Sequence, residues 1–315
     1  MKTLVVILGT TAVGKTELAL LTAERLSAHI VGADSRQIYR DIPIISAAPT
    51  EAEQTRVRHY FVGTHALTDR FSAAAFETAA LDVIDREMRD RDFVVMSGGS
   101  MMYLDAVTHG IDDMPCVDAD VRADVRRRYE RNGLAPLLAQ LRLLDPDYYA
   151  RVDMRNPQRV IHGVEMCLST GRPFSSFHTG QRKERPFRIV KIGLQRERQE
   201  LYERIERRVG QMMADGAMDE ARRVMSLVAD DGGTPSPEAL LALMARTPAI
   251  NTVGLKELLL HLAGAHTHDE AVERIVHSTK IYSKKQMTWF RRDAEIHWLD
   301  AATTTADNII RVVQA

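Results

Sequence analysis

The chain has 315 residues, of which 45% are hydrophobic and 27% are charged, which is enough to bury one large domain and a smaller one. Its formal net charge of −1 excludes an overall attraction to nucleic acid, so any such surface must come from local clustering. Two cysteines without metal-ligand spacing, and no apolar stretch long enough to span a membrane, predict a cytoplasmic protein without membrane contact. We expect a monomer.

An apolar run from Leu4 to Leu8 leads into a glycine-rich loop, and a helical pattern follows. The loop reads Gly9-Thr10-Thr11-Ala12-Val13-Gly14-Lys15-Thr16, which has the P-loop form G-x-x-x-x-G-K-[ST]. In such a loop, backbone N–H groups and the positive end of the helix dipole surround a phosphate. Lys15 would reach phosphate oxygens, and the hydroxyl of Thr16 would ligate Mg²⁺. The pattern predicts a phosphate site, the alternative being a chance match in a turn.

A second strand is predicted at 28–34. Because ligands lie at the carboxyl ends of parallel strands, Asp34 should lie beside the phosphate loop. The alternative is that Asp34 only caps a solvated helix. A third strand is predicted at 93–97, and it ends in Gly98-Gly99-Ser100. A hydrolytic NTPase would carry an acidic residue there to hold Mg²⁺. Its absence argues against an ATPase or GTPase, although Asp34 could take its place.

The middle of the chain changes character. At 112–185 apolar residues recur at helical spacing, which predicts a helical insertion, and 188–194 reads as a strand returning to the sheet. We therefore expect an α/β fold with a P-loop NTPase-like parallel sheet flanked by helices. Its predicted parts are an α/β core at 1–111, a helical insertion domain at 112–186, and a return strand with C-terminal helices at 187–315.

The C-terminal part is predicted to be helical, with a loop at 230–237. A long helix at 267–290 begins with a capping box. Four basic residues share one of its faces: His277, Lys280, Lys284 and Arg291. This face could bind nucleic-acid phosphates, the alternative being solvated lysines beside a core tryptophan.

Five motifs occur in order along the chain: G-T-T-A-V-G-K-T (9–16), D-S-R-Q-I-Y-R (34–40), G-G-S-M-M-Y (98–103), N-P-Q-R-V (156–160) and K-I-Y-S-K-K-Q-M-T-W-F-R (280–291). In this order they resemble the bacterial tRNA dimethylallyltransferases, or tRNA isopentenyltransferases, of the IPP transferase family. The resemblance implies transfer of a dimethylallyl group from dimethylallyl diphosphate to the exocyclic N6 amine of an adenosine. In the family this adenosine lies 3′-adjacent to the anticodon, in tRNAs that read codons beginning with U. The P-loop would then hold the diphosphate leaving group.

The resemblance also implies roles for single residues. Lys15 would stabilise the departing diphosphate, Asp34 would act as general base, and the Ser100 hydroxyl would lie near the amine. The implied diphosphate ligands are Gly9, Thr10, Thr11, Ala12, Val13, Gly14, Lys15, Thr16 and Arg208, with Arg208 preferred to its neighbour Arg204. Thr16 would hold Mg²⁺. The implied contacts to the tRNA anticodon stem-loop are Asp34, Ser35, Arg36, Gln37, Ser100, Arg122, Gln158, Arg159, Val160, Ile161, His162, Lys280 and Lys284.

The chain departs from the family pattern in three places. Met101 and Met102 replace a glycine and an aliphatic residue, which could change the pocket around the prenyl tail. The segment at 254–257 lacks the usual tyrosine, and the stretch at 42–48 lacks a basic residue, which puts a cationic contact from that loop in doubt. The alternatives are an adenylate isopentenyltransferase acting on free AMP, ADP or ATP, a P-loop small-molecule kinase, and a non-catalytic RNA-binding protein.

Overall fold

The structure is a computed structural model, and it describes residues 1–229 and 234–315. The chain forms two compact units, the first made of residues 1–109 and 185–315, the second of residues 110–184. The loop predicted at 230–237 lies partly outside the described residues. None of the described helices is long and apolar enough to cross a membrane.

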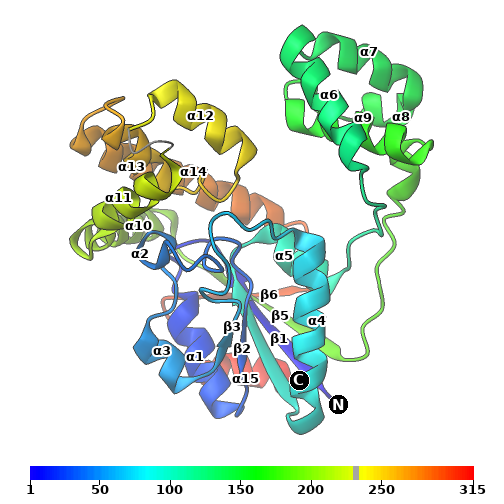
Figure 1. Cartoon of the computed structure of the whole chain (residues 1–315). Coiled ribbons are helices and arrows are strands. Elements are labelled where there is room, and N and C mark those ends of the chain that lie inside the picture. The colour runs from blue at the N-terminus through cyan, green and yellow to red at the C-terminus, as the bar shows by residue number, and fades with distance from the viewer. Residues whose placement is uncertain (230–233) are drawn as a thin grey trace. The chain divides into compact units, whose positions relative to one another are not determined.

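The first unit is built on a six-stranded parallel sheet (Figure 1). Its strands are β1 (Thr3–Gly9), β2 (Ile30–Gly32), β3 (His59–Tyr60), β4 (Phe93–Gly98), β5 (Arg188–Gln195) and β6 (Ile296–Asp300). Their order across the sheet is β3-β2-β4-β1-β5-β6, and every pair of neighbours is parallel. The predicted α/β fold with a parallel sheet is confirmed.

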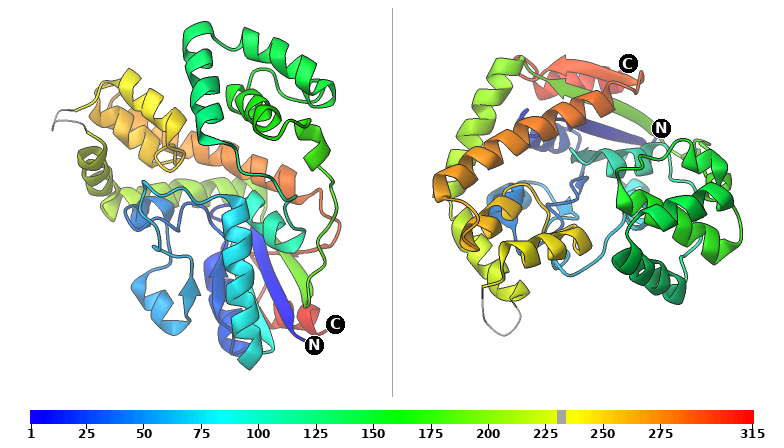
Figure 2. Two further views of the ribbon diagram at one scale, coloured as in Figure 1. Left: turned by 45° about the vertical axis from the view of Figure 1, so that its right-hand side comes forward. Right: turned by 90° about the horizontal axis from the view of Figure 1, so that it is seen from above.

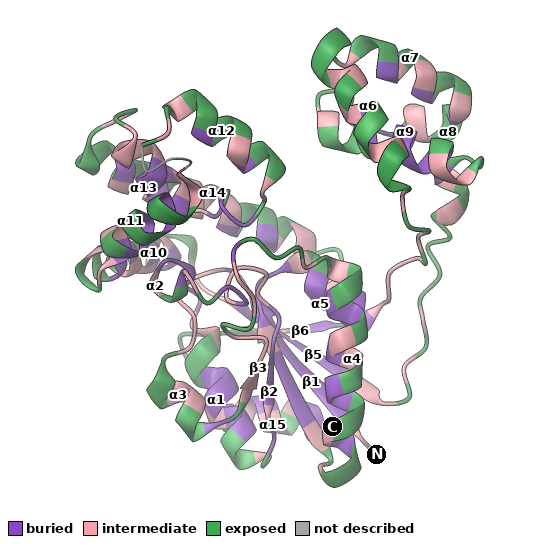
Figure 3. Cartoon of the chain, viewed as in Figure 1, coloured by how far each residue is buried: buried purple, intermediate pink, exposed green. Residues whose placement is uncertain are grey.

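The central strand β1 is buried along its whole length (Figure 3). Helices cover both faces of the sheet: α1 (Lys15–Arg25) and α15 (Ala306–Gln314) on one, and α4 (Ala73–Asp90), α5 (Met101–Thr108) and α14 (His268–Phe290) on the other. Val5 and Ile7 pack in the core of the first face. Leu4 and Val6 pack in the core of the second. This alternation buries both faces of β1 and explains its continuous apolar sequence.

Strand β6 was missed by the sequence analysis. It is an edge strand that pairs only with β5 among the described strands, and only Ile296 in it is fully buried. His297 and Asp300 are exposed. Because the strand lacks a continuous apolar run, its sequence carries no clear strand pattern.

Further helices of the first unit follow β5: α10 (Arg198–Ala214), α11 (Ala217–Val228), α12 (Pro237–Arg246) and α13 (Leu255–Leu262). The long helix α14 lies alongside α10 (Figure 2) and also contacts β1. At its start the predicted capping box is present, since the N–H of Glu270 donates to Thr267 Oγ1 and the N–H of Thr267 to Glu270 Oε2. Helix α14 also reaches the phosphate loop that follows β1, since its Gln286 accepts a hydrogen bond from the N–H of Thr11.

The connection between β2 and β3 contains α2 (Pro43–Ser46) and α3 (Glu51–Arg56). The N–H groups of Ile44 and Ile45 donate to the buried carboxylate of Glu220 on α11, at 2.8 and 2.9 Å. Burial raises the pKa of Glu220, and these two hydrogen bonds oppose that shift. The atypical stretch at 42–48 thus forms an apolar turn fastened to α11.

The second unit is helical. It contains α6 (Ala119–Asn132), α7 (Ala135–Leu144), α8 (Pro146–Tyr149), α9 (Pro157–Thr170) and the 3-10 helix η1 (Phe174–Phe177). Asp145 and Asn156 cap α8 and α9, and a proline follows each at the first helical position. Val125, Leu141 and Val164 lie in its core.

Gly98, at the end of β4, should be intolerant of any side chain. A Cβ there would lie 2.8 Å from the Cα of Ala33, and closer still to the Ala33 carbonyl group. We expect Gly98→Ala to lower the free energy of unfolding by about 3 kcal/mol, measured by urea denaturation. Gly210→Ala is the control, because a Cβ at this α10 position meets open space. It should raise stability by about 0.5–1 kcal/mol. An unchanged urea midpoint for Gly98→Ala would contradict this account.

Candidate active site

The phosphate loop joins β1 to α1. A Cβ at Gly9 would lie 2.7 Å from the carbonyl oxygen of Leu194 on β5, so the loop can leave the sheet here only without a side chain. Gly14 is the N-cap of α1, with a φ of 111° that favours glycine. Lys15 Nζ donates to the carbonyl oxygens of Gly9 and Thr10, at 3.1 and 2.7 Å. The ammonium therefore lies inside the loop.

A second cation lies beside this loop. Arg208, on α10, forms no hydrogen bond or ion pair with any residue that the structure describes. Burial lowers its pKa, and the carboxylate of Asp34 opposes that shift. Burial likewise lowers the pKa of Lys15 to about 8, Asp34 again opposing it and Arg208 adding to it. Two half-buried cations thus lie around one carboxylate, an arrangement that favours binding of an anion.

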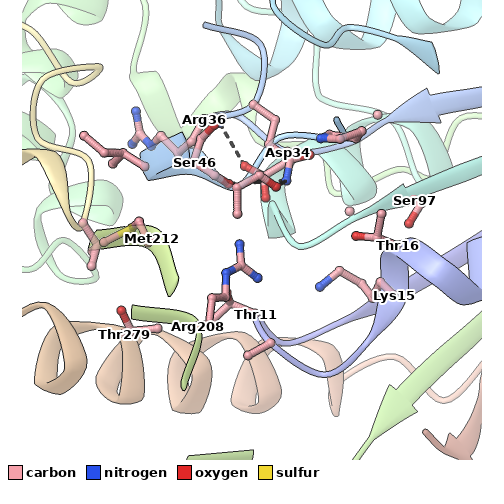
Figure 4. A pocket seen from close by; sticks show the side chains of 18 of the residues that line it. Thr11, Lys15, Thr16, Asp34, Arg36, Ser46, Ser97, Arg208, Met212 and Thr279 are labelled. Carbon is pink, nitrogen blue, oxygen red and sulfur yellow. Dashed lines mark hydrogen bonds between the residues drawn. The ribbon is translucent and has the colours of Figure 1, made fainter. Parts of the chain in front are cut away.

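These groups line one cavity of about 670 Å³ (Figure 4). Lys15, Arg208 and Asp34 approach it from the phosphate loop, α10 and the end of β2. The N–H of Arg36 donates to Asp34 Oδ1 at 2.9 Å, which orients the carboxylate. Tyr282 of α14 lines the same cavity, and burial raises its pKa to about 12, with Asp34 adding to the shift. The cavity can therefore hold an anion and present a proton acceptor beside it.

Ser100 supports this site from behind. Its buried hydroxyl accepts from the N–H of Ser35 at 2.7 Å and donates to Ser35 Oγ at 3.0 Å. It does not line the cavity, whereas Ser35 does. The geometry favours a role for Ser100 in holding the Asp34 turn over the direct contact with the amine that the resemblance implied.

Thr16 fits the chemistry of a magnesium ligand. Its exposed side chain lines the cavity in the first turn of α1, beside Ser97 (Figure 4). Mg²⁺ prefers oxygen ligands and commonly keeps waters and substrate phosphates, so one hydroxyl oxygen is a suitable protein contribution.

Another group of potential metal ligands in the described residues is His109, Asp293 and Glu295. Nζ of the buried Lys191 donates to Asp293 at 2.6 Å and to Glu295 at 2.9 Å, and lies 3.0 Å from His109 Nε2. Because this ammonium occupies the centre of the group, we assign it as an ion-pair cluster.

Comparison with known proteins identifies the family of the chain. The model of the IPP transferase family matches residues 37–293. The chain is 50% identical to tRNA dimethylallyltransferase 1 of Bacteroides thetaiotaomicron over 298 residues, covering 95% of this chain and 91% of that protein. It is 38% identical to the tRNA dimethylallyltransferase of Salinibacter ruber over 308 residues, covering 98% of this chain and 91% of that protein.

The chain belongs to the IPP transferase family. Solved structures of similar proteins have the same fold. The full-length tRNA isopentenylpyrophosphate transferase of Bacillus halodurans is 30% identical, with a TM-score of 0.69 over 100% of this chain and 95% of that one. A eukaryotic dimethylallyltransferase acting on tRNA shares the fold, with a TM-score of 0.85 at 23% identity over 100% of this chain and 79% of that one.

Several of the tRNA contacts predicted for this family member lie around the cavity. Ser35, Arg36 and Gln37 line it. Their polar groups also hold the turn in place, since Arg36 Nη1 donates to the carbonyl of Pro248 at 2.9 Å and Gln37 Nε2 to that of Ala47 at 2.8 Å. These side chains therefore stand at the cavity with fixed orientations.

The basic face of α14 is less uniform than its sequence predicted. Lys280 Nζ donates to Glu206 Oε1 at 2.6 Å and lies 5.0 Å from the ring centroid of Tyr202. Lys284 is exposed. Because Glu206 neutralises much of the charge of Lys280, Lys284 is the better candidate for a phosphate contact.

The predicted contacts in the second unit differ in how far they are exposed. Gln158, Arg159 and His162 are exposed and line a cavity of about 560 Å³ with Tyr148, Arg151 and Phe174 among others. Arg122 is half-buried, with Nε 3.9 Å from the buried carboxylate of Glu165. Val160 and Ile161, by contrast, are 0% and 5% exposed in the core of the unit. Their side chains fill the hydrophobic core, contrary to the prediction of tRNA contact.

Three side chains hold the phosphate loop: Arg204, which the sequence analysis ranked below Arg208 as a diphosphate ligand, and Arg196 and Gln286, to which it gave no role. Arg204 Nε donates to the carbonyl of Ala12 and Arg196 Nε to that of Val13, each at 2.8 Å. Gln286 Oε1 accepts from the N–H of Thr11 at 2.9 Å. Gln286 lies inside the motif at 280–291, which marks it in the sequence, whereas no pattern in the sequence distinguishes Arg196. The N–H of Thr11 donates to Gln286, and that of Val13 donates to the carbonyl of Thr10 at 3.4 Å, so an anion in the loop would have to rely on the remaining N–H groups or displace these bonds.

Substitutions of Arg204 and Arg208 should have different effects on stability and on anion binding. Arg208→Met removes a half-buried cation that makes no hydrogen bond or ion pair in the described residues, so we expect the free energy of unfolding to stay within about 1 kcal/mol of wild type. Binding of inorganic diphosphate, measured by calorimetry, should weaken about 10- to 100-fold. Arg204→Met is the matched comparison, and loss of its bond to the Ala12 carbonyl should cost about 1–3 kcal/mol of stability. Wild-type diphosphate affinity in Arg208→Met would contradict the assignment.

Proposed function

We propose that the chain transfers a dimethylallyl group from dimethylallyl diphosphate to the N6 amine of the adenosine 3′-adjacent to the anticodon, in tRNAs that read codons beginning with U. Family membership and the names of its relatives support this reaction. The observation that carries the proposal is the cavity in which Lys15 and Arg208 lie around the same space as Asp34. It offers an anion site beside a proton acceptor.

The reaction is a displacement at carbon. The N6 nitrogen attacks the first carbon of the dimethylallyl group, and the C–O bond breaks with its electron pair leaving on the diphosphate. Lys15, Arg208 and the start of α1 stabilise the charge that develops on this leaving group. Asp34 accepts the proton that N6 loses, which matters because an exocyclic adenine amine is a weak nucleophile.

Mg²⁺ would be held by the hydroxyl of Thr16 together with diphosphate oxygens and water. It would supply further positive charge to the leaving group.

The tRNA anticodon stem-loop is the proposed acceptor. Its target adenosine must leave the base stack before N6 can reach Asp34, since the cavity is lined on several sides. Ser35, Arg36 and Gln37 stand where they can contact the extruded base, and Lys284 would contact a backbone phosphate. We also propose that Arg122, Gln158, Arg159 and His162 of the second unit contact tRNA. The chain would act as a monomer in the cytoplasm.

One assay tests the function. The protein is incubated with dimethylallyl diphosphate, Mg²⁺ and either tRNA or AMP, and the nucleosides are then analysed by mass spectrometry. The proposal predicts a dimethylallyl mass gain on adenosine in the tRNA sample alone. Product on AMP alone would identify an adenylate isopentenyltransferase. Transfer of phosphate from ATP, with no prenyl product, would identify a kinase.

Replacing Asp34 should affect turnover more than binding. Asp34→Asn keeps the size of the side chain and an acceptor for the Arg36 N–H but removes the base. We expect kcat to fall about 10²- to 10⁴-fold, with the tRNA Kd within about threefold of wild type. Asp82→Asn, an exposed Asp of α4, is the control and should change neither value. Equal losses of kcat and tRNA affinity would indicate a structural role for Asp34.

The low pKa of Lys15 predicts an alkaline limit. The protonated lysine is the form that binds diphosphate, and its pKa of about 8 means that charge is lost above that pH. The pH dependence of kcat/KM reflects the pKa values of groups in the free enzyme. We expect kcat/KM for dimethylallyl diphosphate to fall about tenfold per pH unit above pH 8. In Lys15→Arg the side chain stays positively charged above pH 8. We therefore expect this variant to be slower than wild type but to show no fall in kcat/KM above that pH. A wild-type profile that stays flat to pH 9.5 would refute the assignment.

A further inference from the structure

Gln286 bridges two loops of the active site. It lies on α14 and is 1% exposed. Its Oε1 accepts from the N–H of Thr11 in the phosphate loop at 2.9 Å, and its Nε2 donates to the carbonyl of Gly99 after β4 at 2.8 Å. Both ends of one buried amide are therefore bound to backbone, one on each loop.

From Gly99 the connection continues to the Asp34 turn. The N–H of Ser100 donates to the carbonyl of Ala33 at 3.1 Å, and the Ser100 hydroxyl accepts from the N–H of Ser35 at 2.7 Å. These two bonds hold the residues on either side of Asp34. A hydrogen-bonded path thus runs from the leaving-group loop, through Gln286, to the residues that flank the proposed base.

The lack of a side chain at Gly99 leaves space for the Gln286 amide. A Cβ at position 99 would lie 2.5 Å from Gln286 Nε2. Since real Cβ atoms do not approach other atoms so closely, the glycine leaves room for the amide of Gln286.

Helix α14 also lines the cavity. Ile275, Thr279, Tyr282 and Gln286 follow one another at spacings of four, three and four residues, and all four line it. The helix that would carry the tRNA-contacting Lys284 on its exposed surface is therefore the one that anchors the diphosphate loop.

We propose that Gln286 is a positioning residue that fixes the distance between the diphosphate loop and the Asp34 carboxylate. This inference rests on the proposed prenyl transfer. Without Gln286 the partly buried N–H of Thr11 and the buried carbonyl of Gly99 lose their partners, and the loops shift to find new ones. A displacement of about 1 Å between leaving group and base is enough to slow a reaction roughly 100-fold.

Two variants test the proposal from opposite ends of the contact. Gln286→Met preserves length and removes both hydrogen bonds, and Gly99→Ala displaces the amide by filling its space. Each should lower kcat about 30- to 100-fold at saturating substrates, with the tRNA Kd within about threefold of wild type. The kcat of the double variant should be only slightly lower than that of either single variant, because both substitutions break the same contact. Gln211→Met, at an exposed glutamine of α10, is the control and should leave kcat unchanged.

The outcomes are distinguishable. A wild-type protein that does not prenylate tRNA would refute the proposed function itself. An active wild type with unchanged kcat in Gln286→Met would overturn the role of Gln286, and so would a loss of tRNA affinity equal to the loss of kcat. If Gln286→Met does not fold, Gly99→Ala decides, since a folded variant with normal kcat would overturn the inference.

Discussion

Two backbone segments cross at the carboxyl end of β4 with no space for a side chain between them. A Cβ on Gly98 would overlap the carbonyl group of Ala33, and one on Gly99 would lie 2.5 Å from Gln286 Nε2. The place where a hydrolytic NTPase carries its acid is thus filled by the turn that follows β2. The carboxylate of the site comes from this turn, as Asp34. The crossing therefore brings the proposed base close to a phosphate loop.

The positive charge of the site comes from Lys15 and Arg208, which line the same cavity as Asp34. Burial lowers the pKa of both Lys15 and Arg208, so keeping the two cations costs free energy until an anion binds. Arg196 and Arg204 have a different role, because each binds a carbonyl of the loop and fixes its shape. Such a preorganised site suits a reaction whose developing negative charge appears on a departing diphosphate.

The sequence predicted the parts of the molecule that depend on local pattern. The glycine spacing and its apolar flank indicated the phosphate loop, and continuous apolar runs indicated the central strands. Edge strand β6 has too few buried residues to be recognised. The resemblance at 158–162 suggested tRNA contacts at Val160 and Ile161, where helical periodicity favoured the core that the structure shows. Arg196 and Gln286 hold backbone atoms 183 and 275 residues away, and such bonds leave no local pattern.

We propose that the loop holds a leaving diphosphate that faces Asp34. The most direct test is a crystal structure of the protein with an unreactive analogue of dimethylallyl diphosphate. We expect the diphosphate in the loop, with Lys15 Nζ moved from the Gly9 and Thr10 carbonyls to a phosphate oxygen, Arg208 in contact with the diphosphate, and the first prenyl carbon facing Asp34. A diphosphate bound elsewhere, or a prenyl group directed away from Asp34, would contradict this arrangement.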